Sequence, residues 1–117
     1  VVIDVSYEVE NNVARDFVRD EHASTFFNLK DDGILRFEWY LNEEDKTGTL
    51  IEVFENSQVW EEVGNKLIGS PINLRLRELF TIEKITVLGE ISEAFKEKLK
   101  PMSPPIVKSY TGGIRQD

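Results

Sequence analysis

ILRFEWYLNEEDKTGTLIEVFEN, residues 34–56, is the segment that decides the predicted fold. It contains two runs rich in aromatic and β-branched residues, about 34–42 and 48–55, separated by a polar turn that contains a glycine. Such runs favour strands, and two of them around a short turn predict a β-hairpin. Each run carries a glutamate among bulky apolar residues, Glu38 in the first and Glu52 in the second. The first question is whether these acids form a catalytic pair or the polar half of a sheet face.

The sequence before the hairpin predicts a strand and then a helix. Residues 1–9 alternate between apolar and polar side chains, which is the period of a strand. From Val13 to about Lys30, apolar residues recur at spacings of three and four, which is the period of a helix. Asn11 or Asn12 is expected to cap this helix. The apolar stripe consists of Ala14, Val18, His22, Phe26 and Leu29.

The passage after the hairpin predicts a second helix. Asn56 or Ser57 can cap it by accepting a hydrogen bond from free backbone amides. Residues 69–79 then predict a loop with a short helical turn, since proline suits the first turn of a helix. The inward-facing residues of the second helix are expected to be Val59, Trp60, Val63 and Leu67.

The remaining segments complete an α+β order. Residues 81–90 predict a fourth strand, and residues 93–100 predict a short helix capped by Ser92. Residues 104–114 predict a fifth strand at a sheet edge, because its prolines cannot donate hydrogen bonds. The order β-α-β-β-α-β, with a helix and a strand appended, predicts a ferredoxin-like antiparallel sheet with helices on one face. A chain of 117 residues fits one domain, 1–117.

The two faces of the predicted sheet differ in character. One strand parity is almost wholly apolar and is expected to face the helices: Ile3, Val5, Tyr7, Leu35, Phe37, Trp39, Ile51, Val53, Ile85 and Val87. The other parity mixes charged residues with five large apolar ones: Ile34, Leu50, Phe54, Ile82 and Leu88. Covering such side chains stabilises a protein by roughly 1.5–3 kcal/mol each. We therefore expect a second copy of the chain to cover this face, which makes a homodimer.

The composition of the sequence excludes several classes of binding partner and of catalytic or metal site. The formal net charge of −8 argues against nucleic acid and anionic membranes as partners. The sequence has no cysteine, which excludes disulfides, thiolate metal sites and cysteine nucleophiles. With a single histidine, the usual ligand sets for transition metals are not expected either. The lack of a long apolar run and of a signal-peptide pattern favours a cytoplasmic protein.

Three phrases of the sequence, together with the element order, resemble the antibiotic biosynthesis monooxygenase family of dimeric α+β barrels. They are GILRFEWYLNEE (33–44), GTLIEVFENSQVWEEV (48–63) and ITVLGE (85–90). The resemblance implies a homodimer with its two sheets face to face, and a ligand pocket in each subunit between sheet and helices. It also implies cofactor-independent oxygenation of phenols or quinols. The haem-degrading branch carries a histidine in the helix after the third strand, and residues 57–67 contain none, so neither haem nor another cofactor is expected.

His22 is the candidate catalytic residue. It lies on the apolar stripe of the first helix and is expected to point toward the sheet, where its imidazole could take a phenolic or quinol proton near neutral pH. Phe26, Trp39 and Trp60 are expected to form a flat aromatic pocket for a small aromatic ligand. The alternative is that His22 is a hydrogen-bonded residue at the edge of the core and that both tryptophans are core residues.

The two glutamates also have two interpretations. As cross-strand neighbours roughly 4.5–5.5 Å apart, one would raise the pKa of the other and suit it to acid–base catalysis. Alternatively, they pair with Arg36 and Lys84, because an unpaired buried charge is costly. We expect the second arrangement. The predicted function is therefore monooxygenase-like and centred on His22, with a non-catalytic small-molecule-binding barrel protein as the alternative.

Overall fold

The computed structural model describes residues 1–115. Its strands are β1 (Val2–Tyr7), β2 (Ile34–Asn42), β3 (Thr47–Phe54), β4 (Phe80–Leu88) and β5 (Ile106–Lys108). Its α-helices are α1 (Asn11–Asp16), α2 (Ala23–Asn28), α3 (Ser57–Leu67), α4 (Pro71–Leu79) and α5 (Glu93–Leu99). A π-helix, η1 (Phe17–His22), joins α1 to α2.

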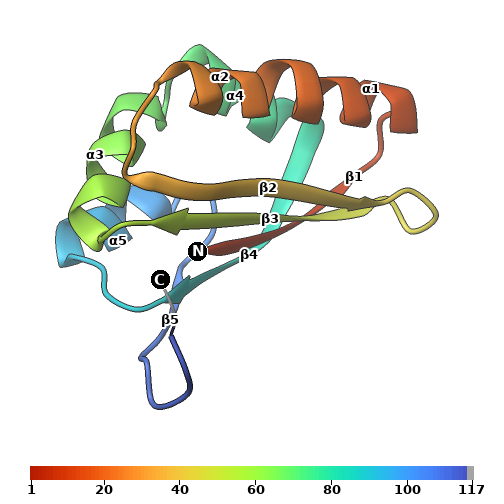
Figure 1. Ribbon diagram of the computed structural model, residues 1–117. Helices are drawn as coiled ribbons and strands as arrows, with labels where there is room; N and C mark the ends of the chain where they lie inside the picture. Colours follow the sequence, from red (N-terminus) through yellow and green to blue (C-terminus); the bar gives the residue numbers. More distant parts are fainter. Residues whose placement is uncertain (116–117) are drawn as a thin grey trace.

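The strands form one mixed sheet in the order β2-β3-β1-β4-β5. Neighbouring strands are antiparallel except β4 and β5, which are parallel. The sheet of this chain is open rather than closed into a barrel, and the helices lie on one side of it (Figure 1). The predicted α+β class and the edge position of the last strand are confirmed, although that strand is only three residues long.

Two of the predicted helix caps are confirmed. The side chain of Asn56 accepts a hydrogen bond from the Val59 amide at 3.0 Å at the start of α3. The Ser92 hydroxyl does the same for the Phe95 amide at 3.1 Å at the start of α5. For residues 69–79 a loop with a short helical turn was predicted; the segment is helical from Pro71, but the helix, α4, extends over nine residues instead of one short turn.

The first helix differs from its prediction at its start and in its middle. It begins at Asn11 after Glu10, without a side-chain cap. Asn11 has another role: its Oδ1 accepts from the Tyr7 hydroxyl at 2.8 Å, and its Nδ2 donates to the Glu43 carbonyl at 3.2 Å. The middle turn is π-helical, and the Ala23 amide donates to the Val18 carbonyl five residues earlier. Single π turns inside α-helices are often found at functional sites.

The predicted facing of β3 was wrong. Trp39 on β2 pairs with Leu50, and Phe37 pairs with Glu52. Cross-strand partners point to the same face of a sheet. Since Phe37 and Trp39 face the helices, Leu50 and Glu52 face them too, and Ile51 lies on the opposite face with its neighbour Val53.

Irregular pairing explains the other errors of strand facing. Opposite β1 the register of β4 shifts between Asp4 and Val5, which pair with Lys84 and Ile82 and leave Glu83 as the extra residue. This bulge reverses the alternation along β4. Ile82 therefore packs against the core on the helix side, as Ile85 also does.

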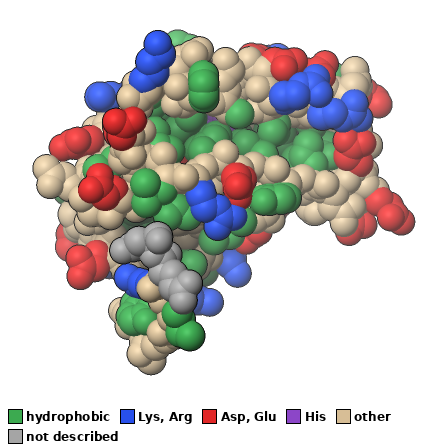
Figure 2. Space-filling view, in the orientation of Figure 1, with side chains coloured by type: hydrophobic (Ala, Val, Ile, Leu, Met, Phe, Trp, Pro, Cys, Tyr) green, Lys and Arg blue, Asp and Glu red, His purple; other side chains and the backbone are tan. Residues whose placement is uncertain are grey.

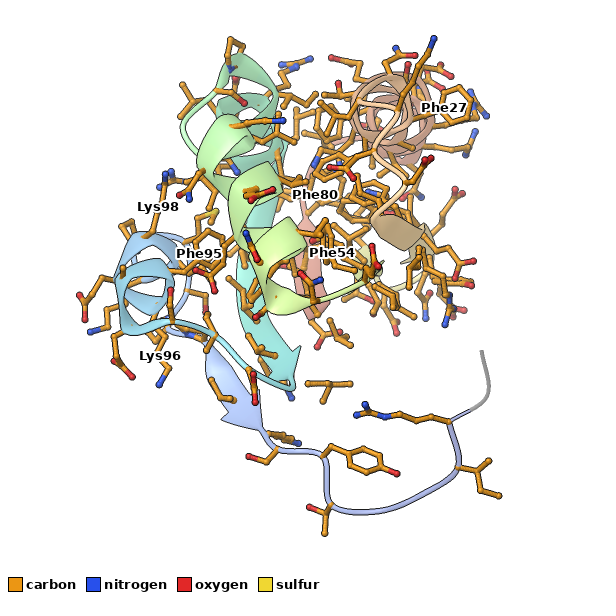
Figure 3. All side chains as sticks on the ribbon, turned by 60° about the vertical axis from the view of Figure 1, so that its left-hand side comes forward. Phe27, Phe54, Phe80, Phe95, Lys96 and Lys98 are labelled. Carbon is orange, nitrogen blue, oxygen red and sulfur yellow. The ribbon has the colours of Figure 1, made fainter. Side chains whose placement is uncertain are left out.

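A second irregularity affects β2. The register of β2 against β3 shifts between Ile34 and Arg36. Leu35, predicted to face the helices, is therefore exposed. Phe54, predicted to lie on the outer face, packs instead against the core cluster of α3 and α5, where Phe95 points toward α3 (Figure 3).

Candidate functional site

Four polar side chains are buried within residues 1–115, and three of them line the same cavity. The three are His22 (4% exposed), Glu52 (6%) and Asn73 (8%), and the fourth is Thr86. The cavity has a volume of about 80 Å³. Buried polar groups are normally placed next to one another only where they satisfy each other, or where they serve a ligand.

The cavity lies between the two core clusters of the protein. Leu76 on its wall belongs to the cluster around η1 and α4, whereas Trp60 and Ile85 belong to the cluster around α3 and α5. The sheet supplies the floor through β1, β3 and β4. The other apolar residues of its wall include Ile3, Phe26, Leu50, Val63, Ile72, Ile82, Phe95, Leu99 and Met102. The cavity is thus an apolar space with three polar groups at its surface.

His22 lies at the end of the π-helical turn and is surrounded by aromatic rings. Its ring centre is 5.2 Å from that of Phe26, 5.3 Å from that of Phe37 and 5.5 Å from that of Trp39. The Trp39 indole N–H donates to His22 Nδ1 at 3.0 Å. An indole nitrogen can only donate, so Nδ1 is the acceptor and Nε2 carries the proton of the neutral ring.

Burial keeps the imidazole of His22 uncharged. Removal from water lowers the pKa of His22 from 6.5 to about 4. At neutral pH the side chain is therefore a neutral hydrogen-bond donor through Nε2. The predicted role of His22 as a base at pH near 7 does not fit this geometry, because its acceptor nitrogen is already occupied by Trp39. A donor that faces an apolar cavity can hold an oxygen atom of a ligand.

Glu52 supplies the group that can accept a proton. Its side chain faces the helices next to Phe37, and within residues 1–115 its carboxyl group forms no salt bridge or side-chain hydrogen bond that satisfies it. Burial raises the pKa of Glu52 to about 7, while the positive amino group of Val1 opposes this change to a lesser extent. A carboxyl group with this pKa exchanges its proton readily at physiological pH, as a general acid or base must.

Asn73 is the third polar group on the cavity wall. Its Oδ1 accepts from the Gly69 amide at 3.1 Å, which ties the start of α4 to the end of α3. Its Nδ2 lies 3.5 Å from the Met102 sulfur, which is a weak acceptor. Asn73 thus lines the cavity with its oxygen bound to the backbone and its nitrogen held only weakly.

The predicted pairing of both glutamates with basic residues holds for Glu38 alone. Glu38 lies on the outer face of the sheet, where its Oε1 accepts from Arg36 and from the Tyr40 hydroxyl. Glu52 points to the opposite face, so the two acids form no carboxylate pair. The prediction that Glu52 pairs with a basic residue was wrong: Glu52 lines the cavity, and the catalytic alternative had been considered for it only as a pair with Glu38.

The structure brings three of the four predicted site residues to the cavity. His22, Phe26 and Trp60 line it. Trp39 does not line the cavity. It contacts His22, and its hydrogen bond to Nδ1 fixes the orientation of the imidazole ring. Asn73 lies in a segment that was predicted to be mostly loop, so the sequence analysis gave no signal for it.

No group of three or more histidine, aspartate or glutamate side chains within residues 1–115 is arranged to hold a metal ion. None of the helices in the same range is long and apolar enough to cross a membrane.

Comparisons with known proteins identify the fold alone. No protein-family model matches the sequence, and no curated protein sequence matches it. The structure is similar to the crystal structure of MupZ from Pseudomonas fluorescens, with a TM-score of 0.72 and 16% sequence identity. The similarity covers 98% of this chain and 91% of the MupZ chain.

The raised pKa of Glu52 predicts that the protein loses stability as pH rises. The folded state holds the proton more tightly than the unfolded state, so the stabilisation is fully present below about pH 4.5 and is lost as pH rises through about 7. Glu52→Gln should remove this loss and raise the free energy of unfolding at pH 8 by on the order of 3 kcal/mol relative to the unmodified protein. Urea denaturation at pH values from 5 to 8 measures the free energy of unfolding of both proteins. Glu38→Gln, on the outer face, is the control that should keep the slope, and parallel profiles for Glu52→Gln and the unmodified protein would contradict the buried state of this carboxyl group.

His22 predicts the opposite dependence in acid. Its pKa is lowered in the folded protein, so stability is lost as pH falls from about 6.5 to about 4, where the buried ring must be protonated. His22→Asn offers Trp39 an acceptor but does not titrate. The melting temperature should therefore fall less steeply as pH is lowered from 7 to 4 for His22→Asn than for the unmodified protein. Equal slopes would show that the ring of His22 is accessible to solvent.

Proposed function

We propose that this protein is a small cofactor-independent monooxygenase-like enzyme that acts on a phenol- or quinol-type aromatic. The observation that supports it is a buried carboxyl group, Glu52, which has no side-chain partner among residues 1–115 and lies in the same apolar cavity as the neutral donor His22. In this proposal Glu52 replaces His22 as the base. His22 keeps a place in the site as the group that holds the substrate oxygen.

The proton transfer follows from the two pKa values. A phenol ordinarily has a pKa of about 10, like tyrosine, so a carboxylate of pKa about 7 accepts its proton with a small energetic cost. The phenolate oxygen then receives a hydrogen bond from Nε2 of His22. Stabilisation of the developing negative charge is stronger in an apolar cavity than in water.

The oxygen step needs no cofactor, because the substrate itself supplies the electrons. A quinol and one molecule of O₂ give a hydroxyquinone and one molecule of water. The quinol loses four electrons: two accompany the insertion of one oxygen atom into a ring C–H bond, and two reduce the other oxygen atom to water. Deprotonation by Glu52 makes the ring a better electron donor to O₂. The protein positions the ring and excludes water, which prevents release of reduced oxygen species.

A non-catalytic small-molecule-binding protein is the second candidate. The cavity volume of about 80 Å³ favours it in one respect: an engineered cavity that takes up benzene has a volume of about 150 Å³, so this cavity as it stands suits a metabolite smaller than an aromatic substrate. In this alternative the same three polar groups fix the orientation of a bound metabolite, and no oxygen is consumed.

We also propose the finer fold and assembly that the family resemblance implies: a ferredoxin-like sheet that pairs with a second copy through its outer face, as in dimeric α+β barrels. Support comes from apolar side chains on that face. Tyr40, Leu88 and Ile106 are exposed there, and Ile51 and Val53 are only half-buried. The residues first expected to drive pairing differ, because Leu50, Phe54 and Ile82 pack on the helix side.

Oxygen uptake tests the reaction. A panel of benzoquinols, naphthoquinols and naphthols should include a compound that the protein oxidises with equal consumption of O₂ and substrate. Glu52→Gln should lower kcat by about a hundredfold or more, which is the usual contribution of a general base. Glu38→Gln should leave kcat unchanged. Saturable binding of these compounds without oxygen uptake would favour the non-catalytic alternative.

Light scattering at micromolar concentration tests the assembly. The proposal predicts a particle of twice the 13.5 kDa chain mass. Leu88→Glu places a charge on the outer face and should give a folded monomer, because an unpaired charge in an interface is costly. Leu74→Glu is the matched control, since Leu74 is also an exposed leucine (52% against 63% for Leu88) but lies on α4, on the helix side of the sheet. A monomer for the unmodified protein, or equal behaviour of both variants, would refute pairing through this face.

A further inference from the structure

A second, larger hollow lies beside the cavity, between α2 and β2. It has a volume of about 550 Å³ and is open to solvent. Figure 2 shows apolar side chains gathered along the gap between the upper helix and the sheet in this region. Its walls include Phe27 and Leu35, which are 80% and 58% exposed, and Phe37. We refer to this hollow as the α2–β2 groove.

Phe26 separates the α2–β2 groove from the cavity that contains Glu52. It is the residue of α2 that lines both spaces. Its ring lies face to face with that of Phe37, with the ring centres 3.9 Å apart and the planes inclined by 18°. On the other side its ring centre is 5.2 Å from that of His22. The half-buried ring of Phe26 is therefore the wall that the cavity and the groove share.

The segment that carries Phe26 is suited to movement. None of the residues of α2 is buried, and the helix is only six residues long. It follows directly on the π-helical turn. Helices with few buried side chains open at low free-energy cost. The stack of Phe26 on Phe37 is thus a main contact that keeps the ring in place.

From these contacts we infer that Phe26 is a movable partition, and that the ligand of this protein is a planar aromatic molecule whose ring takes the place of Phe26 on Phe37. One ring face of Phe37 then contacts the ligand, and the ligand's hydroxyl group reaches His22 and Glu52. The α2–β2 groove holds the remainder of the molecule. This inference rests on the proposed site at Glu52, but it does not require that the ligand be oxidised.

The size of the two spaces supports this ligand class. The cavity alone is too small for a fused ring system, whereas the cavity and the groove together fall within the roughly 300–1,000 Å³ of ordinary ligand sites. The groove carries Lys30, Arg36, Asp31 and Asp32, so its charges largely cancel and select neither an anion nor a cation. An aromatic ligand also replaces the lost Phe26–Phe37 stack with an equivalent one, so opening the partition costs little once the ligand is bound.

Stopped-flow fluorescence with juglone, a planar two-ring hydroxyquinone, tests the inference in the full chain. Juglone quenches tryptophan emission, and Trp39 contacts His22 at the proposed position. The protein has no cysteine with which a quinone would react. Phe26→Ala removes the partition and Phe26→Leu removes only the stack, and either should raise the association rate about tenfold, because the closed state no longer limits binding. Asn28→Ala, at an exposed position of α2 that lines neither space, should leave the rate unchanged.

The outcomes separate this inference from the proposed reaction. Faster association for both Phe26 variants, without change for Asn28→Ala, supports the movable partition whether or not any quinol is oxidised. Equal rates for all variants would overturn it, and so would the lack of saturable binding of juglone to the unmodified protein. If Phe26→Ala is unfolded by circular dichroism, Phe26→Leu decides alone, since it keeps most of the side-chain volume. Oxygen uptake that depends on Glu52 but not on Phe26 would leave the reaction standing and place the entrance elsewhere.

Discussion

The pairing of β2 with β3 fixes the direction of Glu52, and the site depends on this register. Asn42 pairs with Thr47, so the turn between them contains four residues, 43–46. With such a turn each odd-numbered residue of β2 lies opposite an even-numbered residue of β3. Phe37 therefore lies opposite Glu52, and a slip of one residue would turn Glu52 to the outer face.

The hydrophobic pattern of β3 does not determine this register by itself. One parity offers Leu50 and Phe54 to the core together with Glu52, and the other offers Ile51 and Val53. The turn is held from outside: Arg15 on α1 contacts Glu43 through two hydrogen bonds, and Lys46 Nζ donates to the Val9 carbonyl at 3.1 Å. These contacts hold the turn whose length sets the register and thereby turns Glu52 toward the helices.

Much of the fold could be predicted from local sequence signals. The caps Asn56 and Ser92 could be predicted because a side-chain oxygen just before an apolar helical stripe can accept a hydrogen bond from a free backbone amide. The inward position of His22 could be predicted because the π turn changes the helical period only slightly, so His22 stays on the buried face. The facing of β3 and β4 was not predicted correctly. It depends on the length of the β2–β3 turn and on one extra residue in β4, Glu83, and the alternation of apolar and polar residues reveals neither of them.

The site itself was half predicted for the same reason. His22, Phe26 and Trp60 followed from helix stripes, which are local. Glu52 required the register of two strands. Since the turn length can be counted once the two strands are bounded, the signal for Glu52 was present in the sequence: placing Phe37 against the helices obliges its partner to face them too.

The protonation states of the site restrict what it can bind. At neutral pH His22 is uncharged and Glu52 is close to half-protonated, because burial disfavours the charged form of each. A permanent anion would be repelled by Glu52 whenever that group is ionised, and a permanent cation would lose its hydration in an apolar space with at most one negative charge to replace it. A neutral weak acid meets neither penalty, since its proton can be shared with Glu52 and its oxygen can accept from His22. The electrostatics and the aromatic walls therefore favour the same ligand chemistry, a neutral aromatic molecule that carries an exchangeable proton.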